Sequence, residues 1–256
     1  MQKRGFTLIE LLVVIAIIGL LATFAVVQFS GAKEKARLAK AAAVSGQQLR
    51  AIGDDAQMIW NFDDCSGTTV DDLSGNGNDG ILTGTSWSTD THDGKGCSIS
   101  LTNPTGYYTS SKAVTVPQNN MTLSAWFKVT VSADQSIITI TSAVTRLDVY
   151  QTHMRICIAG AYCTPIAVSP GQVVVNDGKW HFATMVGDSK SIRVYVDGSS
   201  VADLTGAASA AIGNTVITSY FTGLVDDVFV FNRALTAEEV HRLYVDGLNP
   251  GRIARK

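Results

Sequence analysis

Lys3-Arg4-Gly5-Phe6-Thr7-Leu8-Ile9-Glu10 opens the segment that decides how this chain is organised. From Phe6 to Phe29 the sequence is predominantly apolar, and Glu10 is its only charged residue. As a helix at about 1.5 Å per residue, these 24 residues would be roughly 36 Å long, which exceeds a hydrocarbon core of about 30 Å. The basic pair before the run favours a cytoplasmic start. The stretch therefore predicts a membrane-spanning helix over residues 6–29.

Three interpretations account for this segment to different degrees. A secretory signal peptide would have an apolar core of roughly 7–15 residues and a small-residue cleavage site. This run is longer and carries Glu10, although Ala22 and Ala25 resemble such a site. A plain membrane anchor explains the length, but it leaves the carboxylate of Glu10 unpaired at a cost of about 2.5–3.5 kcal/mol on insertion scales. The third interpretation supplies a partner for Glu10.

The stretch Gly5-Phe6-Thr7-Leu8-Ile9-Glu10-Leu11-Leu12-Val13-Val14 resembles the N-terminal signature of type IV pilins and pseudopilins. The resemblance implies that a prepilin peptidase cuts after Gly5, that residues 1–5 are a leader, and that the new N-terminal Phe6 is methylated. It also implies that Glu10 pairs with the Phe6 amine of a neighbouring subunit. The chemistry agrees, because an α-amino group titrates near about 7.7–8.0 and a buried amine and carboxylate are tolerable only together.

The predicted helix continues beyond the apolar run. Residues 32–43 are rich in strong helix formers, and the apolar residues that follow recur at helical spacing. No proline occurs between Met1 and Trp60. We therefore expect one helix over residues 6–57, with residues 30–57 beyond the lipid.

The composition changes near Met58, where alanine-rich sequence gives way to short segments rich in Val, Ile, Thr and aromatic residues. Such segments, separated by turn signals, predict strands, and many short strands indicate an all-β sandwich. Thr236 and Glu239 form a capping box for a short helix, which Gly247 ends. The predicted fold is a long N-terminal α-helix, an all-β sandwich over residues 58–246 with a short C-terminal helix, and a basic tail over residues 247–256. The expected strands are residues 122–129, 136–140, 146–150, 154–158, 180–186, 191–196, 215–220 and 224–231.

A second resemblance runs from about Met58 to Tyr244. Five landmarks carry it in order: Trp60-Asn61-Phe62-Asp63-Asp64, the glycine-rich segment 72–80, Asp177-Gly178-Lys179-Trp180-His181, Val194-Tyr195-Val196-Asp197-Gly198, and the segment 223–236. They are similar to the landmarks of laminin-G-like domains in the concanavalin A-like lectin/glucanase superfamily. This resemblance implies a two-sheet jelly roll, an architecture used mostly for recognition.

Calcium is the expected cofactor, because related domains often hold a structural calcium ion where these segments meet. Calcium takes about six to eight oxygen ligands. The alternative is that residues 74–80 are a glycine-rich turn whose Asn side chains cap their own backbone, and both interpretations stay open at this point. The candidate ligands are Asp63, Asp72, Asn76, Asn78, Asp226 and Asp227.

Four cysteines, Cys65, Cys97, Cys157 and Cys163, follow the predicted anchor. Outside the cytoplasm disulfides persist, and four cysteines allow three pairings. We favour Cys157–Cys163 on one expected hairpin, which leaves Cys65–Cys97 as the second bond. Four buried, reduced thiols are the alternative.

Catalysis and nucleic-acid binding are not expected. A glycosidase needs two carboxylates across the scissile bond, but the four glutamates fall in the two expected helices. The sequence has no Gly-x-Ser-x-Gly motif and no phosphate loop, and its net charge of −2 provides no basic field for nucleic acid. A carbohydrate surface would need exposed aromatic side chains. The candidates are Trp87, Tyr107, Tyr108, Tyr150, Tyr162 and Tyr220.

These observations predict a type IV pilin-like filament subunit with a laminin-G-like recognition head, a minor or tip subunit that adheres to a glycan or a surface protein. The alternatives are a structural major pilin or type II secretion pseudopilin without a ligand, and a membrane-anchored lectin that does not polymerise. The expected partners are other pilin subunits, the prepilin peptidase and, before assembly, membrane lipid. The expected location is a single pass in the cytoplasmic membrane with the head outside, and then a surface filament.

Overall fold

The computed structural model divides the chain into two compact units, residues 1–48 and 49–256. It describes Leu8, Ile9, Leu12, Val13 and Ile15 in the first unit, and in the second residues 52–246 except 115, 118–119, 130, 132–133, 141–144, 151–152, 159–161, 166–172, 206–211, 214–215 and 219. The five described residues of the first unit are helical and exposed. Among all described residues, no helix combines the length and apolarity needed to cross a bilayer. Most of the predicted helix 6–57 and the basic tail lie outside the described residues.

The predicted long helix ends before residue 57. Residues 52–54 are helical, and the N–H of Asp55 closes the turn on the carbonyl of Ile52 at 3.2 Å. Strand β1 (Ala56–Trp60) follows, so the expected boundary of the sandwich at residue 58 is two residues too late. The reason is tertiary, because β1 pairs with β18 (Gly223–Phe231) and buries its apolar side chains. Strand pairing here outweighs the helix propensity of Ala, Gln and Met.

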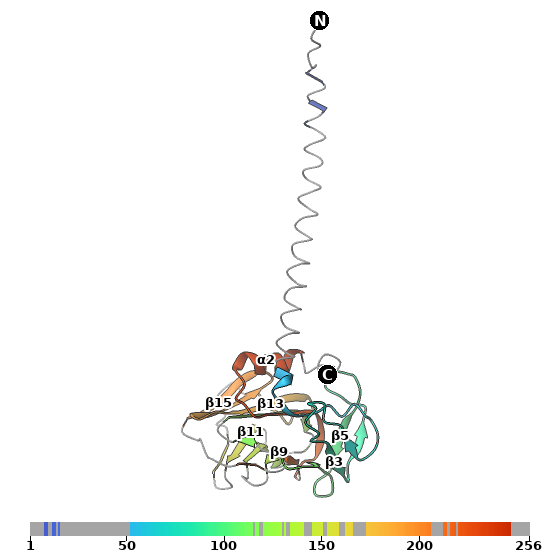
Figure 1. Cartoon of the computed structure of the whole chain (residues 1–256), viewed down its shortest axis with the longest axis vertical. Helices are drawn as coiled ribbons and strands as arrows, with labels where there is room; N and C mark the ends of the chain where they lie inside the picture. Colours follow the sequence, from blue (N-terminus) through green and yellow to red (C-terminus); the bar gives the residue numbers. More distant parts are fainter. Residues whose placement is uncertain are drawn as a thin grey trace. The chain divides into compact units, whose positions relative to one another are not determined.

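The second unit is a sandwich of two antiparallel sheets (Figure 1). Sheet A has the order β15-β14-β13-β8-β18-β5-β4, with β1 also on β18, and sheet B has the order β12-β11-β10-β9-β17-β6-β3-β2; β16 and β7 form a short pair. The remaining sheet A strands are β4 (Ser86–Ser88), β5 (Ser98–Leu101), β8 (Met121–Val129), β13 (Trp180–Gly187), β14 (Ser191–Val196) and β15 (Ser199–Thr205). The sheet B strands are β2 (Thr69–Val70), β3 (Gly80–Thr83), β6 (Tyr107–Ser110), β9 (Gln135–Ile140), β10 (Thr145–Tyr150), β11 (His153–Ile158), β12 (Tyr162–Pro165) and β17 (Val216–Thr218), and the short pair is β7 (Val116–Pro117) with β16 (Ile212–Gly213).

The predicted all-β sandwich with a short C-terminal helix is confirmed. All eight expected strands are present, most within a residue or two of their predicted ends. Helix α2 (Ala237–Asp246) begins with the expected capping box. The Thr236 N–H donates to Glu239 Oε2 at 2.8 Å, and the Glu239 N–H donates to Thr236 Oγ1 at 3.3 Å.

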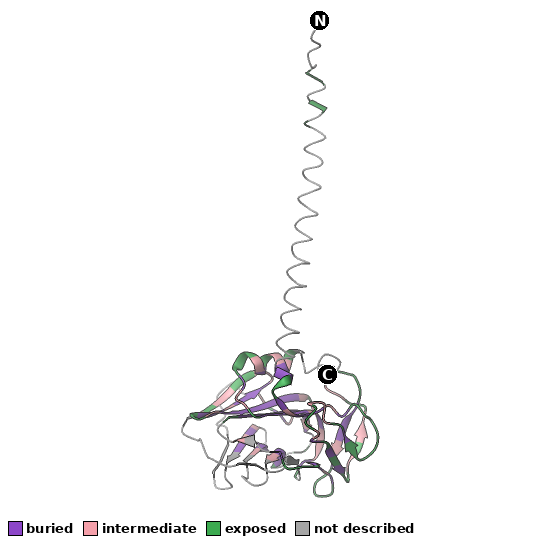
Figure 2. Cartoon of the chain, viewed as in Figure 1, coloured by how far each residue is buried: buried purple, intermediate pink, exposed green. Residues whose placement is uncertain are grey.

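Strand alternation builds two hydrophobic clusters on the two faces of sheet A. In β8, Leu123, Ala125 and Phe127 face sheet B, whereas Trp126 points to the other side. Figure 2 shows the buried segments between the sheets, and Figure 1 shows α2 over the strands of sheet A. The outer cluster packs Val240 and Leu243 of α2, together with Ile52, onto sheet A.

This packing has two consequences for the head, residues 49–256. Among the described residues, the buried members of both hydrophobic clusters lie between Ile52 and Leu243, so the head has its own core and meets the usual definition of an independently folding domain. Ile52, the first described residue of the head, also packs on the outer face of sheet A together with α2. The outer face of sheet B therefore lies on the side of the sandwich opposite Ile52.

Candidate functional site

Strand β18 changes its partner at Asp226 and Asp227. Gly223–Val225 pairs with β5, whereas Val228–Phe231 pairs with β1 on the same side of β18. The register with β8 is also interrupted between Asp226 and Phe229, and Asp227 has a φ of 43°. This is a β-bulge, which locally disrupts the ladder. The bulge leaves the two aspartates at the point where β1 ends and β5 begins.

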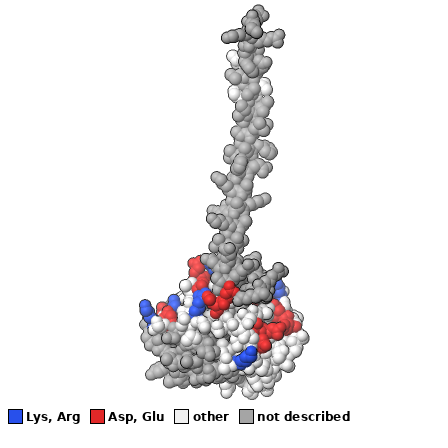
Figure 3. Space-filling model, in the orientation of Figure 1, with Lys and Arg blue, Asp and Glu red and all other residues white. Residues whose placement is uncertain are grey.

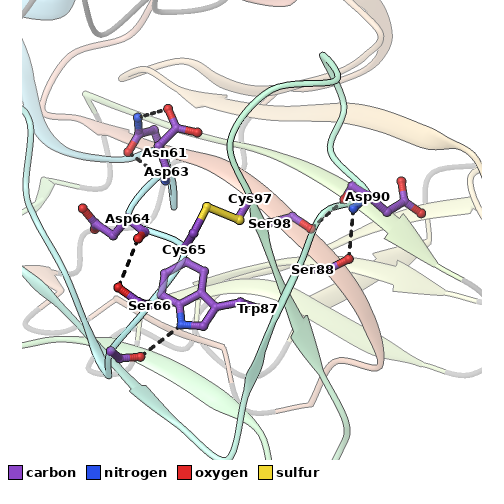
Figure 4. The surroundings of a disulfide bond; sticks show 11 residues. Asn61, Asp63, Asp64, Cys65, Ser66, Trp87, Ser88, Asp90, Cys97 and Ser98 are labelled. Atoms are coloured by element: carbon purple, nitrogen blue, oxygen red, sulfur yellow. Dashed lines mark hydrogen bonds between the residues drawn. A yellow bond between two sulfur atoms is a disulfide. The ribbon is translucent and has the colours of Figure 1, made fainter.

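A disulfide and the loop before β5 close this gap. Cys65 follows β1, Cys97 precedes β5, and the two are bonded with a Cα–Cα distance of 5.4 Å (Figure 4). A crosslink over 32 residues stabilises the fold by about 3–4 kcal/mol in the chain-entropy model. Of the two disulfides favoured from sequence, this one is present. The backbones of Cys157 and Cys163 are cross-strand partners on β11 and β12, but their side chains lie outside the described set, so that bond stays a prediction.

Groups of the closing loop, residues 89–97, form hydrogen bonds with three carboxyl groups. His92 Nε2 lies 2.9 Å from Asp227 Oδ2. The backbone N–H groups of His92 and Asp227 both donate to Asp226, and the N–H of Cys97 donates to Asp63. Gly96 has a φ of 57°, and a Cβ there would lie 1.6 Å from Asp63 Oδ1. Only glycine fits at that position.

Burial controls the protonation of this carboxyl cluster, which we define as Asp63, Asp226 and Asp227. Desolvation, with a contribution from the charge of Asp227, raises the pKa of Asp226 to about 9. Desolvation also raises the pKa of Asp227, although His92 opposes it, and the pKa of Asp63 is raised by burial and by Asp93. Each group therefore favours a proton or a nearby cation over an isolated negative charge.

Aromatic rings line the same loop. The His92 ring stacks on Trp126 with centroids 4.2 Å apart, and Trp180 meets it edge-on at 6.4 Å. Asp90 joins the loop to the sheet, because it accepts from Lys128 Nζ at 2.6 Å and from Trp180 Nε1 at 2.8 Å. Sequence reasoning missed His92, whose only signal was its place between two aspartates shortly before Cys97.

The six predicted calcium ligands divide into two groups, and Asp72, Asn76 and Asn78 do not fit a metal site. Asp72 Oδ1 accepts from the N–H groups of Ile59 and Ser74, and Oδ2 accepts from the Ser74 hydroxyl and the Asn78 N–H. Asn76 and Asn78 donate their amides to backbone carbonyls at the start of β1. These residues tie the glycine-rich turn to β1. The Asn amides bond to carbonyls of β1, whereas the alternative interpretation placed their bonds within their own turn.

The carboxyl cluster fits calcium better in charge, because it places the buried Asp226 and the half-buried Asp227 near the more exposed Asp63 at one gap. Within the described residues, no three His, Cys, Asp or Glu side chains converge in a metal-holding arrangement. A calcium ion at the cluster would therefore need main-chain carbonyls or water as further ligands, which calcium accepts.

A second polar cluster lies on the outer face of sheet B. Leu147 and Val149 face the core, so Asp148 between them points outward. Arg155 Nε and Nη2 lie 3.3 and 3.1 Å from Asp148 Oδ2, and Arg155 Nη1 lies 3.1 Å from Asp134 Oδ2. The same guanidinium stands 4.7 Å from the ring centroid of Tyr150. The alternation Arg146-x-Asp148-x-Tyr150 was the signal in the sequence that could have revealed this cluster.

The aromatic candidates for a carbohydrate surface differ in how far they are exposed. Tyr220 is 59% exposed. Tyr108 is fully buried and donates its hydroxyl to a backbone carbonyl, so it is a core residue. Trp87 is half-buried and donates to the carbonyl of Gly67, and the side chain of Tyr162 is not among those described. Gly5, Phe6 and Glu10, the predicted cleavage, methylation and assembly residues, also lie outside the described residues.

Two family models match the chain. The prokaryotic N-terminal methylation motif covers residues 1–26, and the model of the concanavalin A-like lectin/glucanases superfamily covers residues 102–241. These two matches confirm both resemblances inferred from the sequence. The comparison with curated proteins found no match.

Solved structures share the fold of the head. The binding domain of Paraclostridial Mosquitocidal Protein 1 aligns with a TM-score of 0.61 at 15% identity, over 77% of this chain and 53% of that one. Domain 4 of AbnA, a GH43 extracellular arabinanase from Geobacillus stearothermophilus in complex with arabinotriose, aligns with a TM-score of 0.60 at 15% identity, over 74% and 98%. A botulinum neurotoxin type C structure, whose subject is cell entry through two ganglioside molecules, aligns with a TM-score of 0.60 at 12% identity, over 78% and 52%.

These likenesses establish fold and family. The chain spans about half the length of the toxin structures that it matches. The lectin-like family model, in contrast, covers more than half of this chain. The chain thus belongs to the concanavalin A-like lectin/glucanases superfamily, and a prokaryotic N-terminal methylation motif precedes that domain.

Proposed function

We propose that this protein is a minor, tip-exposed subunit of a type IV pilus-like filament and that its sandwich binds a glycan or a surface protein. One observation carries the proposal: a methylation motif and a lectin-like sandwich occur in one chain. A recognition domain joined to a filament-forming segment suits display of a binding surface.

The N-terminal segment supplies the anchor and the assembly contact in this proposal. Residues 6–29 hold the precursor in the cytoplasmic membrane as a single pass, with the head outside. The prepilin peptidase cuts after Gly5, and Phe6 is methylated. In the filament, Glu10 pairs with the Phe6 amine of a neighbouring subunit, because neither charge is tolerable alone in an apolar core.

Recognition rather than catalysis is proposed for the head. Asp226 and Asp227 are adjacent on one strand, and the loop carrying His92 covers them, so they do not face each other across a substrate bond as glycosidase carboxylates do. The described part of the face in Figure 3 carries acidic groups beside scattered basic ones. Together with the net charge of −2, this supports a ligand other than nucleic acid.

A structural calcium ion completes the proposal. Asp63, Asp226 and Asp227 would hold it, and its charge would replace the proton that burial otherwise retains on Asp226. The ion would then fix the gap where β18 passes from β5 to β1. Asp72, Asn76 and Asn78 are not part of this proposed site.

Immunogold labelling of intact filaments with an antibody to the head tests the proposal. We expect gold at filament ends, or at rare positions along the shaft. Continuous labelling would instead identify the main building block, with the sandwich as a coat. Labelled cells without labelled filaments would point to a secretion pseudopilus or to an anchored lectin that does not polymerise.

A further inference from the structure

We infer that His181 is positively charged in the folded head and acts as a pH-sensitive latch that holds residues 177–179 against the turn between β14 and β15. Two turns meet at this side chain. Asp177-Gly178-Lys179 lies directly before β13, and Asp197-Gly198 lies between β14 and β15. The latch involves neither the carboxyl cluster nor a ligand, so it stands apart from the proposed function.

Both ring nitrogens of His181 face a carboxylate. Nδ1 lies 2.9 Å from Asp197 Oδ2, and Nε2 lies 3.1 Å from Asp177 Oδ1. An ionised carboxylate only accepts hydrogen bonds, whereas a neutral imidazole has one N–H group and one nitrogen lone pair. The imidazolium has two N–H groups and can donate to both carboxylates at once. The charged form of His181 therefore satisfies this geometry, and the neutral form does not.

The two carboxylates also accept from other donors. The Lys179 N–H donates to Asp177 Oδ1 at 2.9 Å, and Lys179 Nζ lies 3.0 Å from Asp177 Oδ2. Burial raises the pKa of Asp177 slightly, but the bonds from Lys179 and His181 hold it well below its ordinary 3.8. The Phe182 N–H donates to Asp197 Oδ1 at 2.9 Å, and the Asp197 N–H donates to the Phe182 carbonyl at 2.8 Å. Asp197 is therefore tied to β13 independently of His181.

Burial makes the two bonds of His181 hard to replace. Its side chain is 8% exposed, whereas those of Asp177 and Asp197 are 27% and 26% exposed. Burial alone lowers the pKa of His181, but the hydrogen bonds to Asp197 and Asp177 outweigh it and raise the pKa above 6.5. A neutral ring would present a lone pair to one carboxylate and lose that bond. Asp177 would be the one released, because Asp197 keeps its bonds to Phe182.

The other elements around the latch add no opposing charge at the ring. Phe127 of β8 lies beside it, with ring centroids 6.1 Å apart. On α2, His241 and Tyr244 pack on the turn between β14 and β15, since a Cβ at Gly198 would lie 2.9 Å from each side chain. The charges that act on the ring come from the two carboxylates, and Lys179 partly offsets that of Asp177.

The latch is closed at neutral pH and opens as the pH rises. Because the folded-state pKa of His181 is raised above 6.5, the stability that its charge contributes is fully present below pH 6.5. That stability is lost as the pH rises through the folded-state value. Loss of the Asp177 bond would free residues 177–179 while the two hydrophobic clusters keep the sandwich folded.

NMR of the isotope-labelled head, residues 49–256, measures the charge directly in the wild type. The His181 ring signals are assigned by their loss in His181→Gln. We expect both ring nitrogens of His181 to carry a proton at about pH 7, and the ring to titrate above the ordinary value for histidine of about 6.5. A ring with one unprotonated nitrogen at that pH would overturn the latch.

Thermal unfolding of the same head measures what the charge contributes to stability. The melting temperature of the wild type minus that of His181→Gln should narrow by about 2–4 °C between about pH 6 and pH 9, because glutamine carries no titrating charge. Asp226 is present in both proteins, so its own pH dependence cancels in the difference. Asp177→Asn should show the same narrowing, because it removes one of the two carboxylates.

His241→Gln is the matched control, because His241 lies beside the same turn and, within the described residues, is not bonded to either carboxylate. Its difference from the wild type should stay constant over this pH range. A constant difference for His181→Gln or for Asp177→Asn would contradict the latch. The filament and its ligand play no part in these measurements, so failure of the proposed function would leave their outcome unchanged.

Discussion

Glu10→Ala is expected to remove this subunit from filaments almost completely while leaving its membrane insertion intact. In the proposed assembly, the variant buries the Phe6 amine of a neighbour without a counter-charge. Removing one partner of a buried ion pair costs about 3–5 kcal/mol, which corresponds to a loss of incorporation of about 100-fold or more. Membrane insertion should not suffer, because the apolar run loses its only charge.

Immunoblots of sheared filaments and of membranes measure both quantities. Glu34→Ala is the matched control, since it removes the same charge from the charged stretch that follows the apolar run. That variant should assemble like the wild type. Normal amounts of Glu10→Ala in sheared filaments would show that the carboxylate has no role in assembly.

Calcium is expected to raise the melting temperature of the head by about 5–10 °C. A ligand at 100 times its dissociation constant stabilises the native state by about 2.7 kcal/mol, and each kcal/mol shifts the melting temperature of a domain this size by about 2–4 °C. The physical reason is the carboxyl cluster, where burial raises the pKa of Asp226 to about 9. A divalent cation would compensate the desolvated charges of Asp226 and Asp227, with Asp63 as a further ligand.

Asp226→Asn should abolish the calcium effect, and pH supplies an independent check without calcium. Because the folded-state pKa of Asp226 is raised to about 9 from an ordinary 3.8, its contribution to stability is fully present below pH 3.8 and is lost as the pH rises towards 9. Asp226→Asn carries no such proton, so its melting temperature should fall less over this range than that of the wild type.

Asp72→Asn is the matched control for calcium. It should lower the melting temperature equally with and without calcium, because Asp72 holds the backbone of the glycine-rich turn. Thermal scans in calcium and in EDTA decide the matter. Identical wild-type curves in the two buffers would contradict a calcium site at the carboxyl cluster.

Local patterns in the sequence predicted much of the fold. The alternation in residues 122–129 marks β8 because its two faces are buried against different layers. The capping box at Thr236 marks the start of α2 because both of its bonds lie within one turn. Such signals depend on residues that are close in sequence, so they can be recognised without a structure.

The candidate site could not be predicted in the same way, because contacts between segments far apart in the sequence bring its residues together. The sequence alone could not show that β18 exchanges β5 for β1 at Asp226, nor that residues 89–97 fold over that gap. The same reason explains why the predicted calcium ligands do not form one site. Asp72 already accepts hydrogen bonds from the backbone of β1 and from Ser74 in its own turn. The Asp148–Arg155 pair was partly predictable from the sequence, because strand alternation assigns each residue to one face. Only the register of β10 and β11 brings the two side chains together.

The most direct test of the central claim, a filament that displays a recognition head, is an adhesion measurement with purified filaments. Filaments from the wild type are compared with filaments from a strain whose chain lacks the head, on surfaces coated with the glycans that the isolated head binds. The account predicts that filaments still form without the head and that their adhesion falls to the level of uncoated surfaces. Equal adhesion of the two kinds of filament would contradict it.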